Sequence, residues 1–340
     1  MSRLRVAVLM GGRSSEHDIS LASAGSVIEA LRDRYDTVSV EIDREGRWAL
    51  PAAVPPALEA PEHDSRPVET LPVPADASVP ATLADVDVVF PVLHGPFGED
   101  GTVQGLLELA GVPYVGPGVL ASALCMDKDV FKAVLRDRGV PVTQSVTLRD
   151  GDPVEHPFSY PVFVKPARLG SSVGISKVHD ESELGPALAL AFRHDEKVLI
   201  EEFIDGLEVE CSVLGNREPI ASLPGQIIAH AEWYDFSAKY DEGGMELVVP
   251  PPISAELVEQ VQRLAVDAFV AGECEGMARV DFFVRDDEVL VNELNTIPGF
   301  TSTSVYARLF AESGISYPAL LDRLIELALE RHERQRRYAY

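Results

Sequence analysis

The chain has 340 residues, 46% hydrophobic and 25% charged, which is ordinary for a globular protein and long enough for two or three domains. Its formal net charge is −26, from 29 Lys and Arg against 55 Asp and Glu. A field of this sign repels nucleic acids and anionic membranes, so neither is expected as a partner. A polyphosphate ligand would therefore need a local basic site.

The apolar segments and the cysteines predict a cytoplasmic protein. No apolar run approaches the roughly 20 residues that a membrane span needs, and the one in "MSRLRVAVLMGGRSSEHD" is too short for a signal peptide. The cysteines lack metal-ligand spacing and lie in apolar surroundings. We therefore expect buried free thiols at Cys125, Cys211 and Cys274.

The chain begins with a strand, a tight turn and a helix. "RVAVLMGG" is the apolar strand, and either Ser14 or Ser15 is expected to cap the helix that follows. Glu16 falls in the first turn, where the helix dipole favours an anion, so the residues alone favour a capping carboxylate over a ligand role. The helix places four apolar residues on one face: Leu21, Ala24, Ile28 and Leu31.

A proline-rich stretch from Leu50 to Ala84 is typical of an irregular surface insert. After it, "DVDVVFPVLHGPFGEDGTVQGLLELAGVPYVG" repeats the opening plan, with a buried strand to Leu93, a turn, a short helix and a further strand. Alternating strands and helices predict a parallel sheet covered on both faces. A ligand would bind at the carboxyl ends of its strands, where four residues lie: Gly11, Gly12, His94 and Gly95.

The segment from Gly118 to Gly139 is expected to be helical, and beyond it the sequence becomes a mostly antiparallel α+β region. Ser254 is expected to cap a helix that Gly272 ends. "ARVDFFVRDDEVLVNELN" predicts a hairpin closed at Asp286-Asp287. Two helices and a basic, solvated end, "RHERQRR", complete the chain.

One loop has the composition of a phosphate-binding loop but an unusual order. In "YPVFVKPARLGSSVGISKV" Lys165 stands at the end of an apolar strand, and Gly170, Ser171, Ser172 and Gly174 follow it. In a P-loop the lysine follows the last glycine. The loop therefore predicts phosphate binding of another kind.

The hairpin suggests a metal site. Side chains alternate along strands, so Arg279 and Asp281 share one face of the first strand, and Glu293 and Asn295 share one face of the second. If the strands pair across the turn, two carboxylates and an amide converge, with Arg279 beside them. Oxygen ligands without His or Cys suit Mg²⁺ and not zinc. An ordinary charged strand face is the alternative, and the spacing alone slightly favours it.

Together with the glycine-serine loop, the hairpin provides the parts for ATP phosphoryl chemistry. "VLIEEFIDGLE" offers an apolar strand that could carry an adenine, with Glu201, Glu202 and Glu208 available for its amino group and the ribose.

In this order and spacing, "KPARLGSSVGISKV", "VLIEEFI", "ARVDFF" and "NELNTIPGFTSTS" resemble the ATP-grasp superfamily. With "GGRSSEHDIS", "HGPFGEDG", "MDK" and "AKY" the chain resembles the D-alanine:D-alanine ligase family over nearly its whole length. The resemblance implies an ATP-grasp fold, α/β and α+β, with an N-terminal parallel-sheet, Rossmann-like domain. It divides the chain into an N-terminal domain (1–117), a central ATP-grasp subdomain (118–202) and a C-terminal subdomain (203–340).

The resemblance implies that ATP activates one D-alanine as an acyl phosphate, which a second D-alanine attacks to give the peptidoglycan precursor D-alanyl-D-alanine. The implied nucleotide contacts are Lys128, Lys165, Ser172, Glu201, Glu202, Phe203, Ile204, Glu208 and Lys239. Two Mg²⁺ ions, for which Mn²⁺ can substitute, would be held by Asp281, Glu293 and Asn295.

It also implies substrate contacts. Glu16, with His94 nearby, would bind the ammonium group of the first D-alanine, which reverses the capping interpretation. Arg279 and the Gly299 backbone would stabilise its oxyanion, and Ser304 would bind the second carboxylate. Glu16, Ser171 and Tyr240 would form a set of hydrogen bonds that closes the site.

Several alternatives remain beside this interpretation. The same fold can join D-alanine to D-lactate or D-serine, and Tyr240 favours the dipeptide. Pro96-Phe97 departs from the family's common pattern close to the first subsite. A nucleotide-binding regulator without turnover is a second class. An NAD-dependent oxidoreductase ranks last because "GGRSSE" lacks the third glycine of the dinucleotide motif. The family suggests a homodimer.

Overall fold

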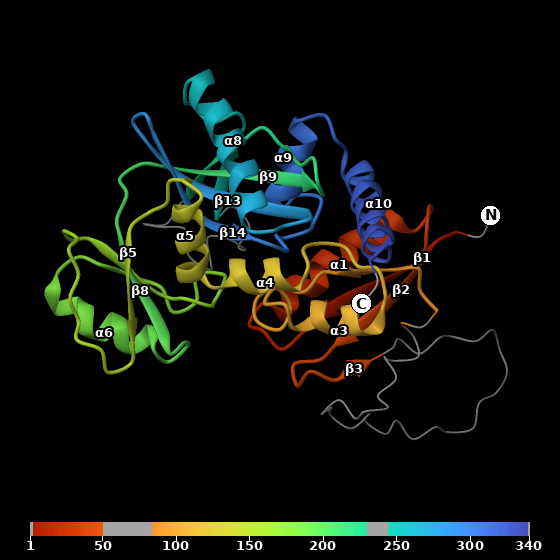
Figure 1. Ribbon diagram of the computed structural model, residues 1–340, viewed down its shortest axis with the longest axis horizontal. Helices are drawn as coiled ribbons and strands as arrows, with labels where there is room; N and C mark the ends of the chain where they lie inside the picture. The colour runs from red at the N-terminus through yellow and green to blue at the C-terminus, as the bar shows by residue number, and fades with distance from the viewer. Residues whose placement is uncertain (1–2, 50–82, 84, 230–243, 339–340) are drawn as a thin grey trace.

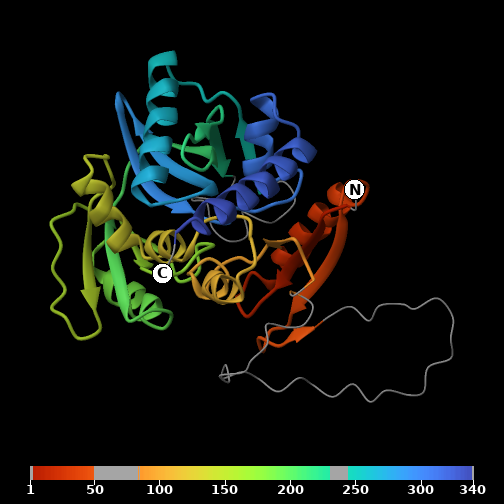
Figure 2. The ribbon, with the colours of Figure 1, turned by 45° about the vertical axis from the view of Figure 1, so that its right-hand side comes forward.

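The computed structural model describes residues 3–49, 83, 85–229 and 244–338. It contains three β-sheets that follow one another along the chain. The red N-terminal sheet and the green central strands lie at opposite ends, with the blue C-terminal sheet between them (Figures 1 and 2). Apart from Leu83, the predicted insert lies outside the described residues, and so do Lys239 and Tyr240.

The N-terminal sheet has the strand order β3-β2-β1-β4. Strands β2 and β4 both pair parallel with β1, whereas β3 pairs antiparallel with β2. The further strand expected after Pro113 is a single parallel bridge between Tyr114 and Val89. The strands are β1 (Arg5–Gly11), β2 (Asp36–Ile42), β3 (Trp48–Ala49) and β4 (Val88–Pro91).

Helices cover both faces of this sheet, as the alternation of strands and helices predicts. Val6 and Val8 of β1 belong to a core with α1 (His17–Leu31) and α10 (Tyr317–Gln335). Ala7 and Leu9 face the other way, toward α3 (Thr102–Ala110). Successive strand residues point to opposite faces, so one strand serves two cores.

Helix α1 packs in part by the expected face. Ala24 and Leu31 are buried as predicted, whereas Leu21 and Ile28 are only half-buried. Ser20 is buried instead, and its hydroxyl accepts from the Gly11 backbone N–H (2.8 Å) and donates to the Val92 carbonyl. Apolar periodicity does not predict these polar contacts with the strand ends.

The central sheet is antiparallel, in the order β5-β8-β6-β7, with α6 (Glu181–Ala191) packed against it. Its strands are β5 (Ser145–Arg149), β6 (Val162–Pro166), β7 (Ser176–Val178) and β8 (Lys197–Glu202).

The segment expected as one helix consists of two, α4 (Val119–Met126) and α5 (Lys128–Asp137). Asp127 separates them, because its side chain caps α5 by accepting from the Val130 N–H (3.2 Å). Buried residues of α4 and α5, Cys125 and Phe131 among them, join the core of the C-terminal sheet.

The C-terminal sheet runs β12-β11-β9-β13-β14, with β10 pairing on β9. Helix α8 (Ala255–Ala271) covers it, and the Ser254 hydroxyl caps α8 as predicted, accepting from the Leu257 N–H (3.3 Å). "PIASLPGQI" forms two short strands instead of one. The strands are β9 (Leu207–Gly215), β10 (Ile220–Ala221), β11 (Gly225–Ala229), β12 (Met245–Val248), β13 (Gly276–Arg285) and β14 (Glu288–Asn295).

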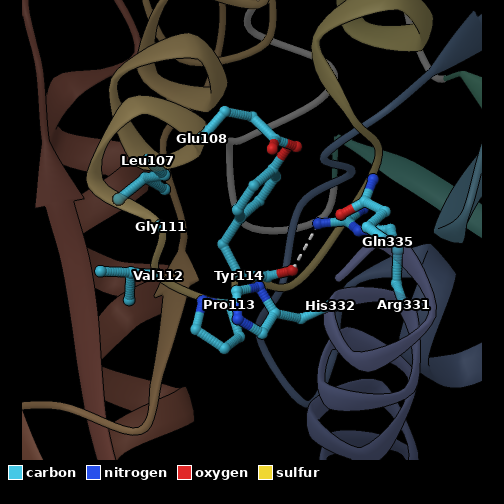
Figure 3. A pocket seen from close by; sticks show the side chains of 9 residues that line it. All are labelled: Leu107, Glu108, Gly111, Val112, Pro113, Tyr114, Arg331, His332 and Gln335. Atoms are coloured by element: carbon cyan, nitrogen blue, oxygen red, sulfur yellow. Dashed lines mark hydrogen bonds between the residues drawn. The ribbon is translucent and has the colours of Figure 1, made fainter. Parts of the chain in front are cut away.

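The basic C-terminal segment is not simply solvated, which corrects the expectation for "RHERQRR". Arg331 is buried and donates to the carbonyls of Tyr114 (2.8 Å) and Gly116. Figure 3 shows its guanidinium group beside Tyr114, next to a cavity of about 30 Å³. These contacts join the end of α10 to the N-terminal domain.

The cysteines are free and buried, as predicted. The sulfur atoms of Cys125 and Cys274 are 3.8 Å apart, and burial raises the pKa of the Cys211 thiol to about 12. Among the helices in the described part of the chain, none is long and apolar enough to cross a membrane.

Candidate active site

The glycine-serine loop joins β6 to β7 and has an unusual backbone. Ser171 (φ 52°) and Ser172 (φ 58°) both lie in the left-handed region, where residues other than glycine are uncommon. Position 174 (φ 73°) requires glycine, since a Cβ there would lie 2.7 Å from the His194 ring. The Ser171 hydroxyl donates to Glu16, which lies 155 residues earlier in the chain.

Glu16 occupies the N-cap position of α1, yet its side chain makes no capping hydrogen bond, so the capping interpretation is wrong. Its carboxylate is buried and accepts from Ser171. Gly95 (φ 71°) passes so close that a Cβ there would lie 2.6 Å from a Glu16 oxygen. Ser14, proposed as the cap, instead donates to the His94 carbonyl (2.6 Å). Glu16 therefore connects the N-terminal domain with the glycine-serine loop.

His94 is buried at the end of the β4 region, as expected for the first subsite. Its Nδ1 lies 3.0 Å from the Ile297 carbonyl and its Nε2 lies 3.4 Å from the Ser23 hydroxyl. A carbonyl only accepts, so Nδ1 carries the proton. Burial lowers the pKa of His94, against an opposing effect of the Glu16 charge. The ring is therefore neutral near pH 7.

Glu99 is a site residue that the sequence analysis missed, although it belongs to the quoted motif "HGPFGEDG". One oxygen accepts from the Gly95 N–H (2.6 Å) and the other from the Ile297 N–H (3.2 Å). Burial, with the nearby charge of Glu16, raises the pKa of Glu99 to about 8. His94 contacts the Ile297 carbonyl, and Glu99 accepts from the Ile297 N–H. The two side chains therefore hold both polar groups of the Ile297 backbone.

The raised pKa of Glu99 gives a testable pH dependence of stability. Between the ordinary glutamate pKa of 4.5 and about 8, the folded protein keeps a proton that the unfolded chain has lost. Stability should therefore fall as pH rises through this window, by at most about 1.4 kcal/mol per pH unit. Glu99→Gln should reduce this slope in urea unfolding measured from pH 5 to 8. Equal slopes for Glu99→Gln, wild type and the exposed-site control Glu312→Gln would contradict the assignment.

Two predicted phosphate ligands, Lys128 and Lys165, are both buried. Lys128 is the first residue of α5, and its Nζ donates to the Leu169 carbonyl (2.8 Å) and lies 3.1 Å from Glu293. Lys165, at the end of β6, contacts the Glu201 carboxylate and donates to Asn292 Oδ1 (3.2 Å). Both lysines therefore bridge the central subdomain region and the C-terminal hairpin.

The hairpin closes at the predicted Asp286-Asp287 turn, where Arg285 pairs with Glu288. A register shift between Asp281 and Phe282 then skips one residue of β14, so that Asp281 pairs with Glu293. Asp281 accepts from Arg279 at both oxygens (2.7 Å each) and from the Asn295 side-chain amide (2.9 Å). Arg279 also contacts buried Glu210 of β9, at 2.8 Å. The polar side chains thus face one another and form a connected network, which excludes an ordinary solvated strand face.

This donor set fits Mg²⁺. Within the part of the chain that the structure describes, no three His, Cys, Asp or Glu side chains gather into a metal-binding cluster. The hairpin instead offers two carboxylates, Asp281 and Glu293, beside the Asn295 amide. Mg²⁺ usually takes one or two carboxylates together with waters and substrate phosphates, whereas zinc favours a closed set with His or Cys.

The predicted adenine segment begins in β8 and extends into β9. Glu201 is buried and its oxygens contact Lys165 and Lys132, and Glu202 accepts from the Gln144 N–H (2.7 Å). The Phe203 ring packs near Phe163 and under the Lys177 ammonium group, 4.7 Å from its centroid. Ile204 is buried and Glu208 is half-buried on β9.

Gly299 and Ser304 lie in the loop between β14 and α9 (Val305–Glu312). Ser304 is the N-cap residue of α9, and its hydroxyl accepts from the Thr301 N–H (3.0 Å). A Cβ at Gly299 would lie 3.3 Å from that hydroxyl, so the Gly299 backbone and Ser304 are neighbours.

The two parts of the chain match two family models. Residues 5–117 match "D-ala D-ala ligase N-terminus", and residues 134–326, more than half of the chain, match "D-ala D-ala ligase C-terminus". The chain belongs to the D-alanine:D-alanine ligase family.

Similar proteins cover its whole length. A D-alanine–D-alanine ligase from Solibacter usitatus is 47% identical, over 98% of each chain. The structure of VanG D-Ala:D-Ser ligase from Enterococcus faecalis is 37% identical, with a TM-score of 0.81 over 96% of this chain and 100% of that one. That of a Bacillus anthracis D-alanine–D-alanine ligase with ATP is 29% identical, with a TM-score of 0.77 over 98% and 99%. The fold is therefore ATP-grasp, as the motifs predicted.

Next to His94, this ligase-family chain has an apolar cavity of about 400 Å³. Pro96 and Phe97, the residues that depart from the common pattern, line it beside α3. Phe97 (φ 69°) is partly exposed, and the Arg13 guanidinium group stacks 4.7 Å from its ring. The departure from the common pattern therefore lies in the wall of this cavity.

Proposed function

We propose that this protein is an ATP-dependent ligase that joins two D-alanine molecules into D-alanyl-D-alanine, a precursor of peptidoglycan. One observation supports the proposal: three contacts join predicted substrate, phosphate and metal residues in pairs on a chain of this family. Glu16 contacts Ser171, Lys128 contacts Glu293, and Arg279 contacts Asp281. The ligases with matching names over the whole chain favour D-alanine over D-lactate or D-serine as the acceptor.

The reaction needs activation, because a carboxylate cannot expel an oxide at neutral pH. A carboxylate oxygen of the first D-alanine attacks the γ-phosphorus of ATP, and the bond to ADP breaks. The amine of the second D-alanine then attacks the acyl carbon and loses a proton, and phosphate leaves. Both steps concentrate negative charge on oxygen, so fixed cations and N–H donors should provide most of the acceleration.

We assign the basic residues to these charges. Lys128 and Lys165 would bind the phosphates, with Ser172 and the rest of the glycine-serine loop closing over them. Arg279 and the Gly299 N–H would stabilise the oxyanion of the tetrahedral intermediate. Arg279 donates two hydrogen bonds to the Asp281 carboxylate. They fix the plane of the guanidinium group, which supports this role.

The carboxylates and hydroxyls would orient the two D-alanine molecules and the adenine of ATP. Glu16 would bind the ammonium group of the first D-alanine near His94, and Ser304 would bind the carboxylate of the second. Glu201, Glu202, Phe203, Ile204 and Glu208 would bind adenosine. Tyr240 would complete the hydrogen-bonded set with Glu16 and Ser171, and Lys239 would approach the nucleotide; both lie outside the described residues.

We assign two Mg²⁺ ions, replaceable by Mn²⁺, to Asp281, Glu293 and Asn295, with the remaining positions taken by water and ATP oxygens. Bound Mg²⁺ supplies positive charge that offsets the charge of the phosphates. We also propose that the enzyme acts in the cytoplasm as a homodimer that associates through its N-terminal domain. Light scattering at micromolar concentration tests the dimer.

The function is tested by mass spectrometry of the products formed from MgATP, D-alanine, D-lactate and D-serine together, across pH. D-alanyl-D-alanine should dominate from neutral pH upward. Dominance of D-alanyl-D-lactate or D-alanyl-D-serine would overturn the acceptor assignment while leaving the ATP chemistry in place. Absence of ADP release would favour a nucleotide-binding regulator instead.

A further inference from the structure

Lys132 is a buried lysine in the central part of the molecule to which the proposed mechanism gives no role. It lies on α5, one helical turn after Lys128, and its side chain is fully buried. Its ammonium group contacts the Thr143 hydroxyl and one oxygen of Glu201. Burying a lysine is costly unless its donors are used, so this position is built around those contacts.

The contacts place Glu201 between two lysines. Lys165 contacts its Oε1 and Lys132 contacts its Oε2, and only about 2% of its side chain is exposed. Each oxygen thus has its own lysine partner, which fixes the plane of the carboxylate. Burial, with the nearby charge of Lys165, lowers the pKa of Lys132, and its contacts with Glu201 and Thr143 use its donors. A carboxylate has about four acceptor positions, so two remain after the lysines are bound.

We propose that Lys132 is a positioning residue that keeps Glu201 ionised and oriented to accept a hydrogen bond from the exocyclic amino group of adenine. The inference rests on the proposed role of Glu201 in nucleotide binding. Lys132 itself need not touch ATP, because it acts through Glu201.

The physical argument concerns what Glu201 would do without Lys132. A buried carboxylate that loses one of two lysine partners is driven toward its protonated form, which can donate where an acceptor is needed. Its free oxygen could also rotate away from the base, since only Lys165 would hold it. Either change weakens binding of a base that presents an amino group, and spares a base that lacks one.

The test compares ATP with purine riboside 5′-triphosphate, the same nucleotide without the 6-amino group. The measured quantity is kcat/KM for ATP divided by kcat/KM for purine riboside 5′-triphosphate, in the full-length enzyme with saturating D-alanine. This quotient is called the nucleotide ratio. Lys132→Met should raise the KM for ATP by about tenfold with a smaller change in kcat, and should lower the ratio by a similar factor. The KM for D-alanine should not change.

Lys197→Met is a matched control. Lys197 is also buried and pairs with two carboxylates, Asp127 and Asp129, but it does not contact Glu201. It should lower stability and leave the nucleotide ratio at the wild-type value. Equal losses with both nucleotides in Lys132→Met would mean a merely structural lysine and would overturn the inference.

Two further variants keep the outcomes distinct. Glu201→Gln should lower the ratio, because its single acceptor oxygen is claimed by the lysines. An unchanged ratio there would refute the adenine role of Glu201 itself. Thr143→Val keeps Lys132 and removes the hydroxyl that Lys132 contacts. It therefore tests the positioning role of Lys132 even if Lys132→Met does not fold. A lowered ratio in Thr143→Val supports positioning, and a wild-type ratio overturns it.

Discussion

Arg279→Ala is expected to lower kcat by about 10² or more while changing the KM for ATP little. The guanidinium group is held by Asp281 and Glu210, and only about 14% of its side chain is exposed. A cation fixed in this way stabilises charge that develops on the substrate oxygen without reorganising during the reaction. Steady-state ADP release with saturating substrates measures the loss.

Arg285→Ala controls for the removal of an arginine from the same strand. Arg285 lies at the exposed end of the hairpin and pairs with Glu288, away from the site. Arg279→Ala also leaves buried Glu210 without its arginine, so unfolding by urea must be measured beside the kinetics. Near wild-type turnover in a folded Arg279→Ala enzyme would refute the oxyanion role.

Glu293→Gln should give the second large effect, an increase of at least about tenfold in the half-saturating Mg²⁺ concentration, together with a lower kcat. Glu293 faces Asp281 across the hairpin and lies 3.1 Å from Lys128. The substitution removes a metal-binding charge, and changes even outside the ligand set commonly cost 10- to 100-fold in metal affinity. Activity titrated with Mg²⁺ at fixed ATP measures the shift.

Glu288→Gln is the matched control, because it removes a carboxylate from the same strand at the far end of the hairpin. It should follow the wild-type Mg²⁺ curve. If Glu293→Gln also followed that curve, Glu293 would serve to hold Lys128 and would not be a metal ligand.

The hairpin shows what sequence alone can predict. Its turn and the alternation within each strand follow from local rules. The cap at Ser254 is equally local. The convergence of Arg279, Asp281 and Asn295 also needs the register shift between Asp281 and Phe282, which the turn does not predict, because without it Asp281 would pair with Asn292. The ordered motifs identified the ATP-grasp fold because they cover nearly the whole chain.

Contacts between distant segments could not be predicted in this way. The role of Glu99 depends on Ile297, which lies in the loop after β14, and that of Lys132 depends on its contact with Glu201. The half-buried Leu21 of α1 is a third case. Apolar periodicity predicts a buried Leu21, whereas Ser20 is buried because it accepts from the Gly11 N–H and donates to the Val92 carbonyl.

Helix α10 adds a consequence for biosynthesis. The core that Val6, Val8 and Phe90 begin is completed by Leu320, Leu324 and other side chains near the end of the chain. The strands of the N-terminal sheet are translated long before α10, so this sheet keeps one apolar face uncovered until α10 has been synthesised. During this interval the nascent chain carries an aggregation-prone surface that a chaperone could shield. A fragment truncated before α10 would retain that surface permanently.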